Sequence, residues 1–175
     1  MRERPPATEY ATWFADYVAL ITEPDVLPVL ERQIEVVNAT AAAVTAEREV
    51  FCYAPGKWTI RQVFGHLTDV ERVFAYRALC ISRGETAELP SFDENLYVAK
   101  SPYDRTPLAD LRAEFIDVRR ANLHFLKRLD DTAWRAIGKA GTSPISVRAL
   151  AYAMAGHVRH HLNGLRQNYH VVTGA

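Results

Sequence analysis

Three histidines in two separate segments are the residues of this sequence best suited to chemistry. His157 and His161 lie four residues apart in SVRALAYAMAGHVRHHLNGLRQNY, and His66 lies far upstream in GHLTDVE. Histidines four apart on a helix point about 40° apart around its axis, so both imidazoles can reach one ion. His160 points about 100° away from His161, which favours a surface or supporting role. The spacing predicts two metal ligands on one helix, with His66 as the candidate third.

This ligand set favours a divalent transition metal. Neutral imidazole nitrogens suit zinc, nickel, iron or copper, whereas magnesium and calcium prefer oxygen ligands. We expect zinc or nickel first, with iron or manganese as alternatives. Three protein ligands leave one position open, which is typical of catalytic sites. An ordinary alternative remains, because a histidine on an apolar helix face is more often a hydrogen-bonded core residue.

Four long amphipathic segments must position these side chains. Apolar residues recur at spacings of three and four over residues 27–44, 60–81, 108–129 and 147–165. The expected N-caps are Asp25, Thr59, Thr106 and Ser146. Gln62 completes a capping box with Thr59, and Pro107 occupies the first position of the third helix. Four helices with matching apolar seams predict an all-α fold, a four-helix bundle.

The segments between these helices suggest how the bundle is connected. Residues 85–106 are rich in turn formers and lack a sustained period, so they predict a long connection of the kind that is often functional. Its length allows a crossed helix order instead of simple up-and-down topology. The segment around Trp13 to Ile21 predicts a short helix that packs as a lid or as a flank of the bundle, and GKAGTSP predicts a turn. A chain of 175 residues fits one domain over residues 1–175.

The composition argues against several function classes. Lysine plus arginine and aspartate plus glutamate both total 21, so we expect no nucleic-acid partner. No stretch approaches the roughly 20 apolar residues of a membrane span, and the start MRERPPATEY lacks the apolar core of a signal peptide. Cys52 and Cys80 do not form a ligand pair, and we interpret them as free thiols of a cytoplasmic protein.

Two segments resemble the DinB/YfiT superfamily of metalloenzymes, most of all the DinB-like domain proteins. They are APGKWTIRQVFGHLTDVERVFAYRAL and SVRALAYAMAGHVRHHLNGLRQNY, and the likeness extends through PSFDENLYV and TPLADLRAEFIDVRRANLHFLKRL to nearly the whole chain. The resemblance implies a four-helix bundle with a crossed helix order and a divalent metal held by three histidines. By motif position these are His66, His157 and His161, the same three that the spacing indicates. Val158 and Gly164 depart from the family pattern, which has an acidic and a bulkier residue there.

The resemblance also implies a reaction class. Members of this superfamily with a known activity are mostly transferases that use a low-molecular-weight thiol, including a mycothiol-dependent maleylpyruvate isomerase and bacillithiol transferases. We therefore expect a metal-dependent transferase or isomerase that activates a thiol cosubstrate and acts on a small molecule. A metal-dependent hydrolase that activates water, and a non-enzymatic stress protein that binds a metal or small molecule, are the alternatives. If the protein assembles, we expect a homodimer through an exposed helix face.

Other side chains are candidates for supporting roles. Arg119 and Asn122 lie beside and within the third apolar seam, where either could orient an anionic substrate or hydrogen-bond a ligand histidine, or form a buried contact between helices. Glu71 is a candidate general base, or part of a solvated helix face. Aromatic side chains could line an apolar pocket near the metal, although such residues more often belong to the core. The candidates are Trp58, Phe92, Tyr97 and Tyr152.

Overall fold

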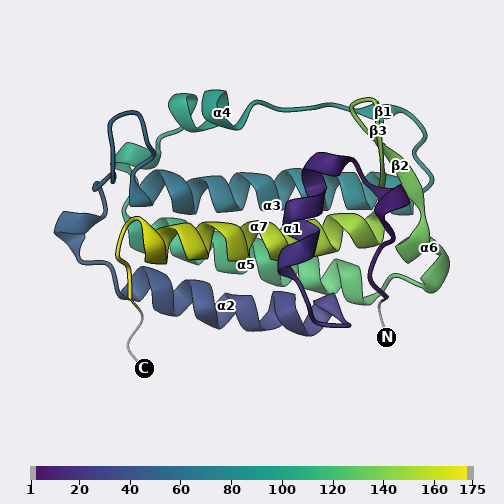
Figure 1. The fold of residues 1–175 in the computed structure, drawn as a ribbon, viewed down its shortest axis with the longest axis horizontal. Coiled ribbons are helices and arrows are strands. Elements are labelled where there is room, and N and C mark those ends of the chain that lie inside the picture. Colours follow the sequence, from purple (N-terminus) through teal and green to yellow (C-terminus); the bar gives the residue numbers. More distant parts are fainter. Residues whose placement is uncertain (1–2, 173–175) are drawn as a thin grey trace.

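The computed structural model describes residues 3–172 of the chain, which form four long helices with shorter elements around them (Figure 1). The long helices are α2 (Val26–Ala42), α3 (Ile60–Ser82), α5 (Leu108–Lys127) and α7 (Val147–Gln167). Each of them coincides with one of the four amphipathic segments of the sequence. The predicted four-helix bundle is therefore confirmed. Within residues 3–172, no helix combines the length and apolar composition needed to cross a membrane.

The four helices are not arranged in sequence order. α2 packs against α5 and α7, and α3 packs against the same two helices. The first two bundle helices therefore lie on a diagonal, whereas a simple up-and-down bundle places consecutive helices side by side. The connection from α3 to α5 returns along the outside of α3, so these two helices run in the same direction (Figure 1). The predicted crossed helix order is confirmed.

Three of the four predicted N-caps act as expected. The side chains of Asp25 and Ser146 accept hydrogen bonds from the first turns of α2 and α7. Thr59 and Gln62 form the complete capping box at the start of α3. Each cap satisfies backbone N–H groups that have no partner within the helix, and each contributes about 1 kcal/mol. These local signals fix where the helices that carry the histidines begin.

The predicted cap at Thr106 is wrong. Its hydroxyl donates to the carbonyl oxygen of Pro102, and α5 begins after Pro107 without a side-chain cap from its own segment. The N–H of Leu108 instead donates to the carboxylate of Glu49, at 3.1 Å. Glu49 lies in the loop between α2 and α3, so a carboxylate distant in sequence performs the capping. A negative charge at this position is also favoured by the helix dipole.

Short elements lie at the ends and flanks of the bundle. Their bounds are η1 (Ala7–Glu9), η2 (Thr12–Phe14), α1 (Ala15–Leu20), η3 (Ala46–Arg48), β1 (Glu88–Leu89), α4 (Glu94–Lys100), η4 (Tyr103–Arg105), α6 (Asp131–Arg135), β2 (Ile137–Ala140) and β3 (Ser143–Ser146). The strands pair in the order β1–β2–β3, with β1 parallel to β2 and β2 antiparallel to β3. The short flanking helix is confirmed as α1. The sheet and α4 were not predicted, because segments this short show no periodic pattern.

The N-terminal segment lies so close to α7 that one position tolerates only glycine. A Cβ atom on Gly156 would lie 2.0 Å from the backbone carbonyl oxygen of Tyr17. Because the obstacle is backbone, the two segments must move apart to admit a methyl group. We expect Gly156→Ala to lower the free energy of unfolding by about 2 to 3 kcal/mol, measured by urea denaturation.

Gly164 provides the matched control for this variant. It lies in the same helix, and a Cβ built there meets no atom within 4 Å. Gly164→Ala should raise the free energy of unfolding by about 0.5 to 1 kcal/mol, because alanine loses less backbone entropy in a helix. Similar values for both variants would show that the close approach at Tyr17 does not constrain the fold.

Candidate metal centre

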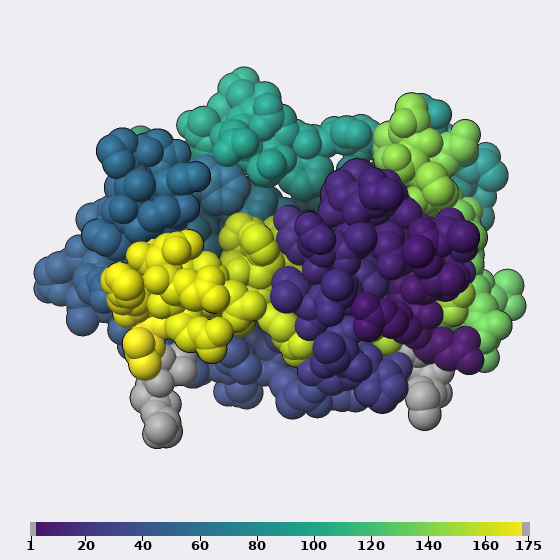
Figure 2. Space-filling model, viewed as in Figure 1, coloured from purple at the N-terminus to yellow at the C-terminus, as the bar shows by residue number. Residues whose placement is uncertain are grey.

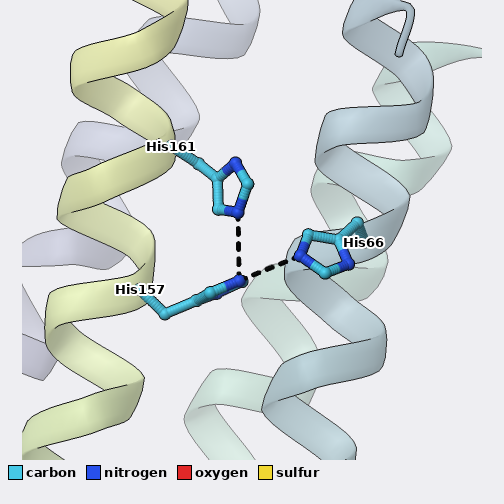
Figure 3. Close-up of side chains that lie close together, drawn as sticks. All are labelled: His66, His157 and His161. Carbon is cyan, nitrogen blue, oxygen red and sulfur yellow. Dashed lines mark hydrogen bonds between the residues drawn. The ribbon is translucent and has the colours of Figure 1, made fainter. Parts of the chain in front are cut away.

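His66 from α3 and His157 and His161 from α7 point toward one another in the space between the two helices (Figure 3). Nε2 of His157 lies 2.9 Å from Nε2 of His66 and 3.0 Å from Nε2 of His161. One ligand atom from each ring lies within 4.8 Å of the others. The structure thus brings together the three histidines that the spacing and the resemblance indicate. His160 lies outside this group and is exposed.

Ordinary helix geometry positions the three rings. His157 and His161 are one turn apart on the side of α7 that faces α3, and His66 is the seventh residue of α3. Five of the ten α7 residues before His157 are small and buried: Ala149, Ala151, Ala153, Ala155 and Gly156. Small side chains let neighbouring segments approach α7 closely. The approach of α3 and α7 leaves room for imidazole rings between them but buries His66 and His157 almost completely.

Hydrogen bonds alone do not satisfy this arrangement, whereas a metal ion fits it. A neutral imidazole nitrogen carries either one proton or one lone pair, yet Nε2 of His157 faces two other ring nitrogens. Tetrahedral coordination with bonds of about 2.0 to 2.1 Å would place ligand nitrogens about 3.3 Å apart. The two short separations would have to widen by only a few tenths of an ångström. The donor set is therefore suited to one divalent ion.

Burial keeps the three rings in the form that binds metals. Desolvation lowers the pKa of His66 to about 4. Desolvation, reinforced by the neighbouring imidazoles, also holds the pKa values of His157 and His161 well below the ordinary histidine value. A histidine must be unprotonated to coordinate a metal. Near neutral pH all three rings are neutral, so no proton has to be displaced before an ion binds.

Aromatic side chains pack around the trio and restrict its rings. The ring of Trp58 lies 4.6 Å from that of His66 and is stacked 6.3 Å from that of His161, measured between centroids. Tyr17 contacts His157 edge-on at 5.5 Å. These contacts limit the rotamers available to the histidines, which favours a preorganised ligand set.

The histidines form part of the wall of a cavity of about 660 Å³. Its other lining residues are Trp13, Tyr17, Trp58, Val70, Phe74, Arg77, Ser91, Phe92, Glu94, Ala140 and His160. The space-filling view shows a hollow between the N-terminal segment, the connection that carries α4, and α7 (Figure 2). A cavity of this size, with aromatic side chains and a few polar groups in its lining, is typical of sites for small molecules.

The four aromatic candidates have different surroundings. Trp58 and Phe92 line the cavity beside the histidines. Tyr97 is about half exposed and packs on the ring of Phe92 at 5.4 Å, at an adjoining groove. Tyr152 is fully buried in the core, and its hydroxyl donates to the carbonyl oxygen of Pro24. The structure thus places two of the four in the cavity and Tyr152 in the ordinary core.

Arg119, Asn122 and Glu71 bond to one another. The guanidinium of Arg119 donates to both carboxylate oxygens of Glu71, at 2.7 and 2.8 Å, and to Gln33 at 2.9 Å. Asn122 donates to the same carboxylate at 3.1 Å. Arg119 and Glu71 are almost completely buried between helices, and none of the three candidates is among the cavity residues. For Arg119 and Asn122, the observed arrangement is the buried polar contact between helices that was the alternative to a catalytic role. The solvated helix face expected as the alternative for Glu71 is wrong, because Glu71 is buried by its contact with Arg119 from α5.

Arg77 is one of the cavity residues that were not predicted from the sequence. It follows His66 by eleven residues, which is three helical turns plus about 20°, so both residues lie on one face of α3. This spacing was visible in the sequence. The burial of Arg77 was not, because segments distant in sequence create it. The segment that carries Trp13 and Tyr17 is predicted to be a lid or flank of the bundle, but no local pattern marks these two side chains as cavity residues.

Comparisons with known proteins agree with this architecture. The family model described as the DinB superfamily matches residues 8–164. Among solved structures, the chain is similar to YfiT from Bacillus subtilis, with a TM-score of 0.75 and 17% sequence identity over 97% of this chain and 95% of that chain. YfiT is described as a probable metal-dependent hydrolase with an unusual four-helix bundle topology. No curated protein matches this sequence. At this identity the likeness to YfiT concerns the fold.

Proposed function

Because this chain belongs to the DinB superfamily, we propose that it is a metal-dependent enzyme whose metal is held by His66, His157 and His161. The observation that carries the proposal is the convergence of three neutral imidazoles, two buried and one partly buried, on the wall of a cavity sized for a small molecule. We expect zinc or nickel in this site, with iron or manganese as alternatives. Once bound, such an ion would act as a Lewis acid that lowers the pKa of a thiol or of water.

The leading reaction is the transfer or isomerisation of a small substrate with the help of a low-molecular-weight thiol. The cavity supports this choice because aromatic rings cover much of its wall, including Trp13, Trp58 and Phe92. Such walls exclude water from a reactive thiolate and from its electrophile. The three histidines line this space, so the thiol and the second substrate could lie together beside them.

Two polar side chains of the cavity are suited to handle protons. His160 lies beside the trio with its ring 5.1 Å from that of His161, and it is exposed. It is the group best placed to accept the proton of an incoming nucleophile. Burial raises the pKa of Tyr17, whose ring contacts His160 at 5.6 Å. The hydroxyl of Tyr17 therefore keeps its proton near neutral pH and can donate a hydrogen bond to a substrate oxygen.

A metal-dependent hydrolase that activates water is the second candidate. It is favoured by the structural similarity to YfiT, whose description names a probable hydrolase. The same proton acceptor, His160, would then serve the attacking water. If neither reaction occurs, the remaining proposal is a non-enzymatic protein that binds a metal or a small molecule.

Cobalt-substituted protein distinguishes these possibilities. We expect 2-mercaptoethanol to produce a saturable sulfur-to-cobalt charge-transfer band, because the thiol binds as thiolate at the open position. The loaded protein should also accelerate the reaction of this thiol with 1-chloro-2,4-dinitrobenzene by at least about tenfold over the metal-free protein. Absorption spectroscopy follows both the band and the product.

The control variant is His66→Ala, which should show neither cobalt band nor acceleration. If the protein hydrolyses p-nitrophenyl acetate only when metal is bound, and the thiol produces no charge-transfer band, the transferase proposal is wrong and the hydrolase proposal is supported. If thiol binding and both reactions are absent while cobalt is bound, the enzyme proposal is wrong.

A further inference from the structure

Arg77 is a buried cation without a negative partner. Arg77 as a whole residue is 3% exposed. Nη2 donates to the carbonyl oxygen of Pro90 at 2.7 Å, but Nη1 has no hydrogen-bond partner within the described chain. Among residues 3–172, no carboxylate lies within 4.0 Å of its guanidinium. Because a buried charge is costly unless it is paired, this arrangement calls for an explanation.

The other buried arginines of this fold are paired. Arg119 forms a two-pronged ion pair with Glu71, and Arg148 forms one with Glu9. Arg77 instead lies between two aromatic rings, with its guanidinium carbon 6.0 Å from the ring centroid of Phe74 and 5.7 Å from that of Phe92. Burial lowers the pKa of Arg77, since only a phenol, that of Tyr97, acts in the opposite direction. The cation–π contacts orient the guanidinium but do not neutralise it.

Arg77 shares one cavity wall with the metal centre. His66, Val70, Phe74 and Arg77 follow one another at spacings of four, four and three along α3, and all four line the 660 Å³ cavity. At 1.5 Å per residue, the Cα atoms of His66 and Arg77 are about 16 Å apart along the helix. The wall therefore has a metal-ligating end, an apolar middle and a cationic end.

We infer that Arg77 binds the carboxylate of a substrate whose apolar body lies along Val70 and Phe74 and whose reactive end lies at the three histidines. This inference rests on the proposed function and deepens it by naming the substrate class, a small organic acid. A guanidinium pairs with a carboxylate through two parallel hydrogen bonds. Because Nη1 is itself buried, the guanidinium would have to turn toward the cavity for Nη1 to gain its missing partner. A single carboxylate fits better than a phosphate dianion, because the cavity has one arginine and an exposed carboxylate, Glu94.

Two matched probes test this assignment: 4-phenylbutyrate and its neutral amide, 4-phenylbutanamide. Isothermal titration calorimetry should show that the wild-type protein, metal-free or cobalt-loaded, binds the acid about 10 to 100 times more tightly than the amide. Arg77→Met should reduce this ratio to about one, and Arg77→Lys should retain part of it. Arg72→Gln should leave the ratio unchanged, because Arg72 is an exposed arginine of the same helix that pairs with Glu114.

Thermal unfolding separates the loss of a ligand contact from a loss of structure. Arg77→Met removes an unpaired buried charge, so its melting temperature should equal or exceed that of the wild type. Equal affinity of the wild type for acid and amide would overturn the inference. A preference for the acid over the amide that survives in Arg77→Met would also overturn it. Loss of this preference in Arg72→Gln would do the same, because it would place the acid in the neighbouring groove. If cobalt fails to bind while the acid preference persists in metal-free protein, the role of Arg77 stands and the metal proposal fails.

Discussion

His157→Ala is expected to reduce the bound metal from about one ion per chain to nearly none. Nε2 of His157 is the central atom of the trio, within 3.0 Å of both other nitrogens. Its removal leaves two ligands on different helices. We expect the metal affinity to fall by more than about 100-fold, because losing a residue that only supports a ligand already costs up to about 100-fold. Metal analysis after loading and dialysis measures the stoichiometry. X-ray absorption should give nitrogen ligands at about 2.0 to 2.1 Å if the metal is zinc.

The matched control for this variant is His160→Ala. His160 belongs to the same helix and lines the same cavity, but its ring is not part of the convergent group. The His160→Ala protein should keep the full metal content, and its X-ray absorption spectrum should match that of the wild type. A His157→Ala protein that retains its metal, or a His160→Ala protein that loses it, would show that the ion is held elsewhere.

Arg119→Met is expected to lower the free energy of unfolding by about 3 to 5 kcal/mol. Arg119 from α5 pairs with Glu71 from α3 and donates to Gln33 and the Leu30 carbonyl of α2. Without the guanidinium, the carboxylate of Glu71 stays buried with Asn122 as its remaining partner, and its desolvation is no longer offset. Urea denaturation of the variant, compared with the wild type, measures the loss.

Two comparisons identify the ion pair as the cause. The double variant Arg119→Met/Glu71→Leu removes both charges and should recover most of the loss, because apolar replacements can substitute for a buried pair. Arg72→Gln breaks an exposed pair with Glu114 and should change the free energy of unfolding by less than about 1 kcal/mol. If Arg119→Met costs no more than Arg72→Gln, the buried pair does not hold these three helices together.

The parts of the structure that the sequence predicts well are those set by local periodicity. The apolar seams of the four helices repeat at helical spacing, and the caps at Asp25 and Ser146 precede them directly, so helix number and starts follow from nearby residues. The same holds for His157 and His161, which one helix must place on one side. That His66 faces them depends on how α3 packs against α7, and for this the family resemblance supplied what spacing alone left open.

The features that escaped prediction depend on contacts between distant segments. Glu49 caps α5 from a loop almost sixty residues earlier, so the hydroxyl of Thr106, an apparently good cap, was free to bond elsewhere. Nothing in the local sequence distinguishes Arg77 from an exposed helix arginine. Its burial arises when the connection between α3 and α5 packs over it, with Pro90 accepting its hydrogen bond. The roles suggested for Arg119 and Asn122 depended on which partner each would find across the bundle, and that partner is Glu71. Such pairings leave no mark on local sequence.

The cavity is built from two kinds of chain segment. Its metal-ligating histidines lie on bundle helices, whereas Trp13, Phe92 and Ala140 come from the N-terminal segment, the connection and the hairpin. Surface segments tolerate replacement and insertion far better than packed helices do. A protein of this design can acquire new substrates through changes in its peripheral segments while the reactive core stays intact. Selection can thus adjust the part of the specificity that these segments set without altering the metal site, whereas the contacts of Val70, Phe74 and Arg77 change only with the bundle helix α3.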